Sequence, residues 1–349
     1  MIVKPSPQAP TIAEQFASAF AEAGLPPNVI QYFHCGEPDL LETIIQSPLI
    51  NHICFTGSVA GGLAVQKAAS DRVVNVGLEL GGKDPAYIRN DVDLAWAAEE
   101  IVDGAVFNSG QSCCAIERVY VHKDVHDGLV AEIKNVLSKY LVGDPFKKET
   151  QVGPVISKRA KATIEAHIAD AVSKGAKDET PANASFDNFP AEGNYVKLTL
   201  LTGVDHSMTV MKDETFGPVI PVMKVEDDQE AVKLMNDSEF GLTASIWTKD
   251  IGLAETLIEQ VEAGTVFINR CDFPSPVSLS QREVTRGLAN VLNPHRILHG
   301  PAGRTQAVAS PLASLDLSSS QSSRATTSKT IPSNCCHSGN PILLITQLK

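Results

Sequence analysis

The sequence has little that would place the chain in a membrane, outside the cell or on a nucleic acid. No run of about 18 apolar residues occurs, and the opening MIVKPSPQAP lacks the apolar stretch of a signal peptide. The 29 basic residues are fewer than the 41 acidic ones, and a net charge of -12 disfavours phosphate backbones and anionic lipids. We therefore expect a cytoplasmic protein with no nucleic-acid or membrane partner.

The sequence also lacks the cysteine patterns of disulfide frameworks and metal sites. The seven cysteines are odd in number, two pairs of them are adjacent, and no Cys-x-x-Cys occurs. The nine histidines are dispersed along the chain. We expect free thiols in a reducing compartment and no metal site.

The amino-acid composition and charge of the chain change near residue 273. Its 349 residues suffice for about two domains. There are 22 basic and 39 acidic residues up to position 273, but only 7 and 2 after it. The second stretch is rich in Ser and Thr and has no apolar period. We expect residues 274–349 to be a divergent, disordered tail with a candidate short strand at PILLITQLK, and a regulatory tail is the alternative.

The first 273 residues alternate between segments typical of strands and segments typical of helices. This alternation predicts an α/β fold with a mainly parallel sheet. The expected strands are 2–4, 28–33, 52–57, 73–80, 86–89 and 118–122, and the expected helices are 11–24, 39–46, 59–71, 94–107 and 125–141.

A strand that stops at Gly57 and a helix that starts at Ser58 form a turn suited to a phosphate group. Ser58 can cap the helix, whose free N–H groups attract an anion. Gly57, Gly61 and Gly62 would let a phosphate approach the backbone closely. Many such turns carry Gly and Ser only to reverse the chain, so a purely structural turn is the alternative.

Two residues farther along are candidates for catalysis. Glu79 lies at the end of a strand expected to be buried, just before Gly81 and Gly82. Burial there would raise the pKa of its carboxyl group and make it a usable general base, and a structural ion pair with Lys83 is the alternative. Cys113 lies in the polar loop FNSGQSCCA after a helix. A lowered thiol pKa would make it a nucleophile there, and a buried structural thiol is the alternative.

Taken together, these segments resemble the aldehyde dehydrogenase superfamily from about residue 2 to about residue 273. LELGGK is similar to the family's glutamate motif and GQSCCA to its cysteine motif, with Glu79 and Cys113 separated by 34 positions. FTGS is similar to its cofactor-phosphate turn, and ETFGPV, GLTA and GTVFIN match further landmarks. The resemblance implies a partial Rossmann-like cofactor domain at 1–80 and an α/β catalytic domain at 81–273.

The resemblance also implies a mechanism and a set of site residues. Cys113 would attack an aldehyde to give a thiohemiacetal, hydride would pass to NAD(P), and Glu79 would activate water to hydrolyse the thioester to a carboxylic acid. The backbone N–H of Cys113 would be one oxyanion donor. The residues implied at the cofactor are Lys4 (adenosine ribose), Gly57, Ser58 and Gly62 (pyrophosphate), Leu80 (nicotinamide), and Glu214 and Phe216 (nicotinamide ribose and ring). We expect NAD, with NADP open because Pro7 stands where many NAD-preferring relatives have an acid.

Three family features have no match in the sequence. These are the Trp-Asn motif that supplies a second oxyanion donor, the central strand of the nucleotide-binding sheet, and the pattern after Asp272. Without that central strand its two neighbours must pair with each other or leave backbone groups unsatisfied.

We therefore expect an N-terminally truncated aldehyde dehydrogenase that acts on a small-molecule aldehyde, as a homo-oligomer or paired with a full-length homologue. A catalytically impaired fragment that binds a dinucleotide or such a homologue is one alternative. A thiol hydrolase that uses Cys113 without a cofactor is the other.

Overall fold

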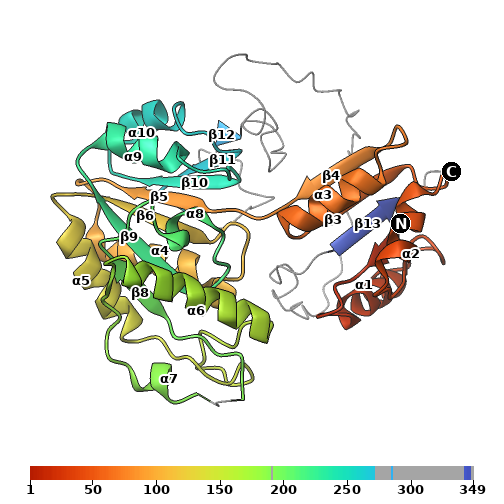
Figure 1. Ribbon diagram of the computed structural model, residues 1–349, viewed down its shortest axis with the longest axis horizontal. Coiled ribbons are helices and arrows are strands. Elements are labelled where there is room, and N and C mark those ends of the chain that lie inside the picture. The colour runs from red at the N-terminus through yellow and green to blue at the C-terminus, as the bar shows by residue number, and fades with distance from the viewer. Residues whose placement is uncertain (190–191, 272–283, 286–341, 347–349) are drawn as a thin grey trace, which may run out of the picture.

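The computed structural model describes residues 1–189, 192–271, 284–285 and 342–346, and two sheets organise them (Figure 1). The smaller sheet has the order β2-β1-β13-β3-β4. Its strands are β1 (Ile2–Lys4), β2 (Gln31–Tyr32), β3 (His52–Thr56), β4 (Asn75–Glu79) and β13 (Ile342–Thr346).

The larger sheet has the order β12-β11-β10-β5-β6-β9-β8-β7, so the chain changes sheets between β4 and β5. Its strands are β5 (Asp84–Ile88), β6 (Ile116–His122), β7 (Lys177–Asp178), β8 (Thr199–Thr202), β9 (Val219–Val225), β10 (Thr243–Trp247), β11 (Thr265–Ile268) and β12 (Val284–Thr285). The six strands from β11 to β8 in this order run parallel to one another, whereas β12 and β7 at the two ends pair antiparallel. The predicted α/β fold with a mainly parallel sheet is confirmed.

The helices follow their strands in the order that the alternation predicts. Within the described ranges, no helix combines the length and apolar character needed to span a membrane. The helices are α1 (Thr11–Glu22), α2 (Pro38–Gln46), α3 (Val59–Ala68), α4 (Leu94–Val106), the 3₁₀ turn η1 (Phe107–Gly110), α5 (His126–Leu137), α6 (Lys158–Ser173), α7 (Ala184–Asp187), α8 (Thr209–Lys212), α9 (Asp228–Asn236) and α10 (Ile251–Ile258).

The larger sheet carries a separate apolar core on each face. Side chains alternate along a strand, so Ala86 and Ile88 of β5 pack with α4 and α5, whereas Tyr87 packs with α6, α9 and α10. β6 repeats this alternation, and Tyr120 is fully buried on the same side as Tyr87. Both faces are covered by helices, and this explains why the strands read as nearly continuous apolar runs.

Two expected strands are shorter in the structure. The strand expected at 28–33 contains only Gln31–Tyr32, because Asn28 takes a left-handed φ of 67° after the two prolines that precede it. The strand expected at 73–80 begins at Asn75, two residues later. Most of the expected disordered tail lies outside the described residues, but the candidate strand at its end is confirmed as β13.

Candidate active site

The site residues expected in the catalytic half lie where the two sheets face each other. The Leu80–Lys83 segment leads from the end of β4 to the start of β5 (Figure 1). The Cys113 loop comes just before β6, and the Glu214–Phe216 segment comes just before β9. Since β5, β6 and β9 are parallel neighbours, all three segments meet at the same edge of the larger sheet.

Two glycines bring these segments into contact. A Cβ atom at Gly82 would lie 2.2 Å from the carbonyl oxygen of Cys113, and one at Gly81 would lie 2.4 Å from the carboxylate of Glu214. The N–H of Gly82 donates a hydrogen bond of 3.0 Å to Oε1 of Glu214. A side chain at Gly82 would collide with the backbone of Cys113, so glycine is required there for the two segments to approach this closely.

The loop that carries Cys113 is held in an uncommon backbone conformation. Asn108, Ser109 and Gly110 take positive φ values of 51°, 62° and 71° in succession at the end of α4. The Ser109 hydroxyl donates to the carbonyl of Gly153 at 2.9 Å, and Gln111 accepts from the N–H of Ile156 at 2.8 Å. Left-handed non-glycine residues persist only where surrounding contacts over-determine them, and they cluster at functional sites.

The thiol of Cys113 is half-buried, with its sulfur 3.8 Å from that of Cys114. Both cysteines pack against the apolar core of the smaller sheet, which includes Leu80. The Cys113 side chain is thus fixed by packing yet partly accessible, as a nucleophile must be.

A buried network stabilises the Glu214–Phe216 segment. The ammonium group of Lys83 donates to the carboxylate of Glu117 at 2.5 Å and to the hydroxyl of Thr215 at 3.0 Å. The backbone N–H groups of Thr215 and Phe216 donate to the same carboxylate at 2.7 and 2.8 Å. Phe216 has a φ of 51°, so the network holds a strained turn beside the candidate site.

The electrostatics of this region favour a protonated Glu214. Burial raises its pKa to about 8, and the nearby Glu117 carboxylate adds to the increase. The hydrogen bond from Gly82 acts in the opposite direction. Glu214 can therefore exchange a proton near neutral pH.

Glu79 makes its contacts in the smaller sheet. Its carbonyl accepts from the N–H of Gly57 at 2.9 Å, and its register partner is Thr56. Partial desolvation raises the pKa of the Glu79 carboxyl group. The pKa of the Cys54 thiol is also raised, mainly by burial and in addition by the negative charge of Glu79. The strand is not buried as we expected, because β4 is the edge of its sheet and Glu79 itself is exposed.

The turn expected to hold a phosphate has the predicted geometry. Ser58 caps α3, and its hydroxyl accepts from the N–H of Gly61 at 3.2 Å. A Cβ at Gly62 would lie 2.6 Å from Leu80, so this helix packs tightly on the segment that leads to the larger sheet. Lys4 ends β1, and its ammonium group donates to the carbonyl of Pro5 at 2.9 Å.

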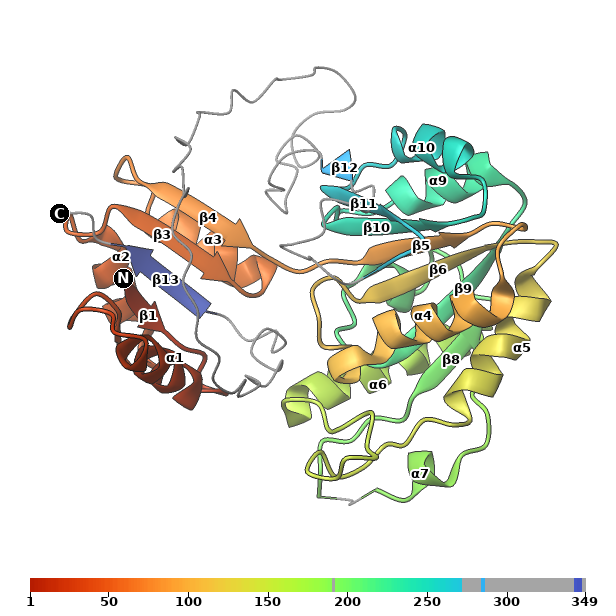
Figure 2. The same ribbon diagram turned by 180° about the vertical axis from the view of Figure 1, so that it is seen from behind.

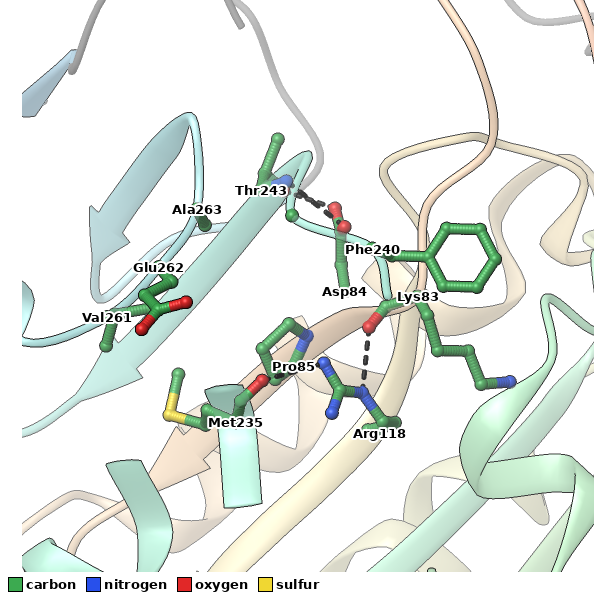
Figure 3. A pocket seen from close by; sticks show the side chains of 11 residues that line it. Lys83, Asp84, Pro85, Arg118, Met235, Phe240, Thr243, Val261, Glu262 and Ala263 are labelled. Carbon is green, nitrogen blue, oxygen red and sulfur yellow. Dashed lines mark hydrogen bonds between the residues drawn. The ribbon is translucent and has the colours of Figure 1, made fainter. Parts of the chain in front are cut away.

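A small pocket lies next to this region, at the start of β5 (Figure 3). Arg118 is fully buried there and donates to the carbonyls of Lys83, Leu234 and Met235, which ties the end of α9 to β5. Figure 3 shows that the Lys83 side chain points away from this pocket. Asp84 accepts from the N–H of Thr243 at 3.1 Å. These contacts make the pocket part of the framework that supports the site.

The Lys83–Glu117–Thr215 network was not predicted from the sequence. The alternative of a structural pair between Lys83 and Glu79 is wrong, because Lys83 pairs with Glu117. One signal was available: Glu117 and Arg118 are charged residues inside the otherwise apolar strand IERVYVH. Charges in a buried strand need partners, and this would have directed attention to the lysine of GGK.

Comparison with known proteins gives consistent matches. The family model for the aldehyde dehydrogenase family matches residues 1–279. Retinaldehyde dehydrogenase 3 from Homo sapiens is 37% identical over 270 residues, which cover 77% of this chain and 52% of that protein. An NADP-dependent glyceraldehyde-3-phosphate dehydrogenase from Bacillus halodurans, solved with NADP, is 37% identical with a TM-score of 0.69 over 78% of this chain and 55% of that one. A betaine aldehyde dehydrogenase from Staphylococcus aureus, solved with NAD⁺, is 30% identical with a TM-score of 0.71 over 78% and 54%.

The chain spans about half the length of the relatives it matches. Within that span the structural similarity, with TM-scores of 0.69 and 0.71, confirms the expected aldehyde dehydrogenase type of α/β fold. The chain belongs to the aldehyde dehydrogenase family.

Proposed function

We propose that the chain oxidises a small aldehyde to a carboxylic acid with a nicotinamide dinucleotide, using Cys113 as the nucleophile. One observation carries the proposal: the glycine contacts that place the Cys113 loop against the Leu80–Lys83 and Glu214–Phe216 segments. In this proposal residues 1–80 form the partial cofactor unit, 81–273 the catalytic unit, and 274–349 the divergent tail.

The residues at the end of β3 fit the pyrophosphate of such a cofactor. The first turn of α3 presents backbone N–H groups beyond its Ser58 cap, and an anion is favoured at that end of a helix. A Cβ at Gly61 would lie 2.7 Å from Phe55 and one at Gly62 would lie 2.6 Å from Leu80, so glycine at both positions lets the first turn of α3 pack closely on the smaller sheet. Lys4 would contact the adenosine ribose, and Leu80, Glu214 and Phe216 would border the nicotinamide end. Solved relatives contain NADP or NAD⁺, so we retain NAD as the expected cofactor with NADP open.

The proposed chemistry assigns separate tasks to separate residues. The Cys113 thiolate attacks the aldehyde carbonyl, and the oxygen that becomes negative is stabilised by the backbone N–H of Cys113. When bound, the nicotinamide ring supplies the hydride acceptor that lets the thiohemiacetal carbon become a thioester. Glu79 then takes a proton from water, which attacks the thioester and releases the carboxylic acid and the Cys113 thiolate.

A catalytically impaired fragment is the second candidate, and one observation favours it. The contacts of Glu79 connect it to Gly57, Thr56 and Cys54 in the smaller sheet. The proposed hydrolysis requires this carboxylate to activate a water molecule beside Cys113. Without that activation the chain would bind a dinucleotide or a full-length homologue with little turnover.

Formation of reduced cofactor on addition of aldehyde tests the proposal. We expect turnover in the wild-type chain and in Cys114→Ala, and none in Cys113→Ala. Dinucleotide binding without turnover in the wild-type chain would support the fragment. Ester hydrolysis with no cofactor present would instead support the thiol hydrolase.

A further inference from the structure

The centre of the smaller sheet is occupied by a strand from the far end of the sequence. β13 lies between β1 and β3 and runs antiparallel to both, whereas β1–β2 and β3–β4 are parallel pairs (Figure 2). Its five residues pair with all five residues of β3, and three of them also pair with all of β1. β1 and β3 are therefore joined through β13 and do not pair with each other.

Without β13 the sheet would fall into two separate pairs of strands. An isolated two-stranded ribbon is marginally stable in water, whereas three or more strands with an apolar face can be stable. The facing edges of β1 and β3 would also present unsatisfied N–H and C=O groups beside buried residues such as Val3 and Ile53.

The sequence of β13 suits a central position. Its five residues, ILLIT, form a continuous apolar run up to the final threonine, the pattern of a strand covered on both faces. The surrounding tail is rich in Ser and Thr. Its neighbours in register include Ile53, which is fully buried, and Phe55, which is nearly so.

We propose that β1 and β3 form a slot for one extended segment and that Ile342–Thr346 of this chain is its occupant. Main-chain hydrogen bonds to both edges supply the affinity, as in other cases of strand addition. The first residue of β13, Ile342, pairs with Thr56, the last residue before the Gly57–Ser58 turn. The occupant therefore also holds the end of β3 from which α3 begins.

A native cysteine allows a direct test of this placement in the full chain. Cys54 is the β3 partner of Leu344, whereas Leu343 is opposite Phe55. Directly opposite residues have Cα atoms about 4.5–5.5 Å apart, within the range of a disulfide. Under mild oxidation we expect Leu344→Cys to form a disulfide with Cys54 that peptide mass mapping detects, and Leu343→Cys to form little of it. No Cys54 cross-link at position 344, or equal cross-linking at both positions, would overturn the proposal.

Amide hydrogen exchange tests what the occupant does for the sheet. Leu344→Pro removes one main-chain donor from the middle of β13, whereas Leu344→Val keeps it. We expect Leu344→Pro to speed exchange in β1 and β3 at least about 10-fold relative to β5 and β6, and the free peptide PILLITQLK to restore protection. Unchanged exchange in β1 and β3, or an equal loss in both sheets, would overturn the proposal. Neither readout uses cofactor or aldehyde, so the result is independent of the proposed activity.

Discussion

Replacing Lys83 by Met is predicted to destabilise the catalytic half through Glu117. The side chains of Lys83 and Glu117 are 0% and 4% exposed, and their charged atoms lie 2.5 Å apart. Methionine fills a volume similar to that of lysine, so the main effect is to leave a buried carboxylate without its cation. Burial lowers the pKa of Lys83, and the charge and hydrogen bond of Glu117 oppose that decrease.

The size of the effect follows from what remains around the carboxylate. Removing one partner of a buried ion pair costs about 3–5 kcal/mol. The N–H groups of Thr215 and Phe216 still donate to Glu117 in the variant, so we expect the lower end, about 3 kcal/mol. A loss of that size is a large fraction of the total stability of a typical domain, about 5–15 kcal/mol.

Urea unfolding of the single and double variants measures this cost. In Lys83→Met/Glu117→Gln the uncompensated charge is gone, so we expect the double variant to be more stable than Lys83→Met alone. Lys123→Met is the control, because the Lys123–Glu226 pair is solvent-exposed at a similar distance of 2.6 Å, and we expect no measurable change. A cost below about 1 kcal/mol for Lys83→Met, or a double variant less stable than it, would refute the reasoning.

Three further predictions follow from the site. Gly82→Ala should lower the free energy of unfolding by about 1–3 kcal/mol and reduce activity, because its Cβ would lie 2.2 Å from the carbonyl oxygen of Cys113. Gly77→Ala is the control in the same unfolding and turnover assays, and it should be tolerated because its Cβ would lie 3.5 Å from the nearest atom. Because the pKa of Glu214 is about 8 in the folded chain and 4.5 in the unfolded chain, the free energy of unfolding should fall as pH rises from about 4.5 to about 8. An equal fall in Glu214→Gln would contradict this. Ser58→Ala should cost about 1 kcal/mol of stability through the lost cap of α3, and an unchanged unfolding midpoint would argue against that role.

The sequence predicts most of the fold because local patterns and tertiary packing agree over most of the chain. The helix at 94–107 and the strand at 118–122 are found within two residues of their expected bounds, since each has a clear apolar period and a buried face. The cap at Ser58 is confirmed for a similar reason, because a Ser between a strand and a helix has one preferred role.

What the sequence could not predict depends on contacts between distant segments. The pairing of Lys83 with Glu117, the approach of Gly82 to Cys113, and the raised pKa of Glu214 each require the folded arrangement of three loops. The position of β13 is a stronger example. The apolar run ILLIT is typical of a strand covered on both faces, but it does not specify that the strand enters the sheet formed by the first 80 residues.

The central claim is that Cys113 forms a covalent bond with the substrate, and the mass of the trapped intermediate tests it most directly. Glu79→Gln should slow hydrolysis, so that a short aldehyde and a nicotinamide dinucleotide leave an acyl group on the enzyme. We expect peptide mapping by mass spectrometry to place that group on Cys113, and to find it nowhere in Glu79→Gln/Cys113→Ala. An acyl group on another residue, or none on Cys113, would contradict the account.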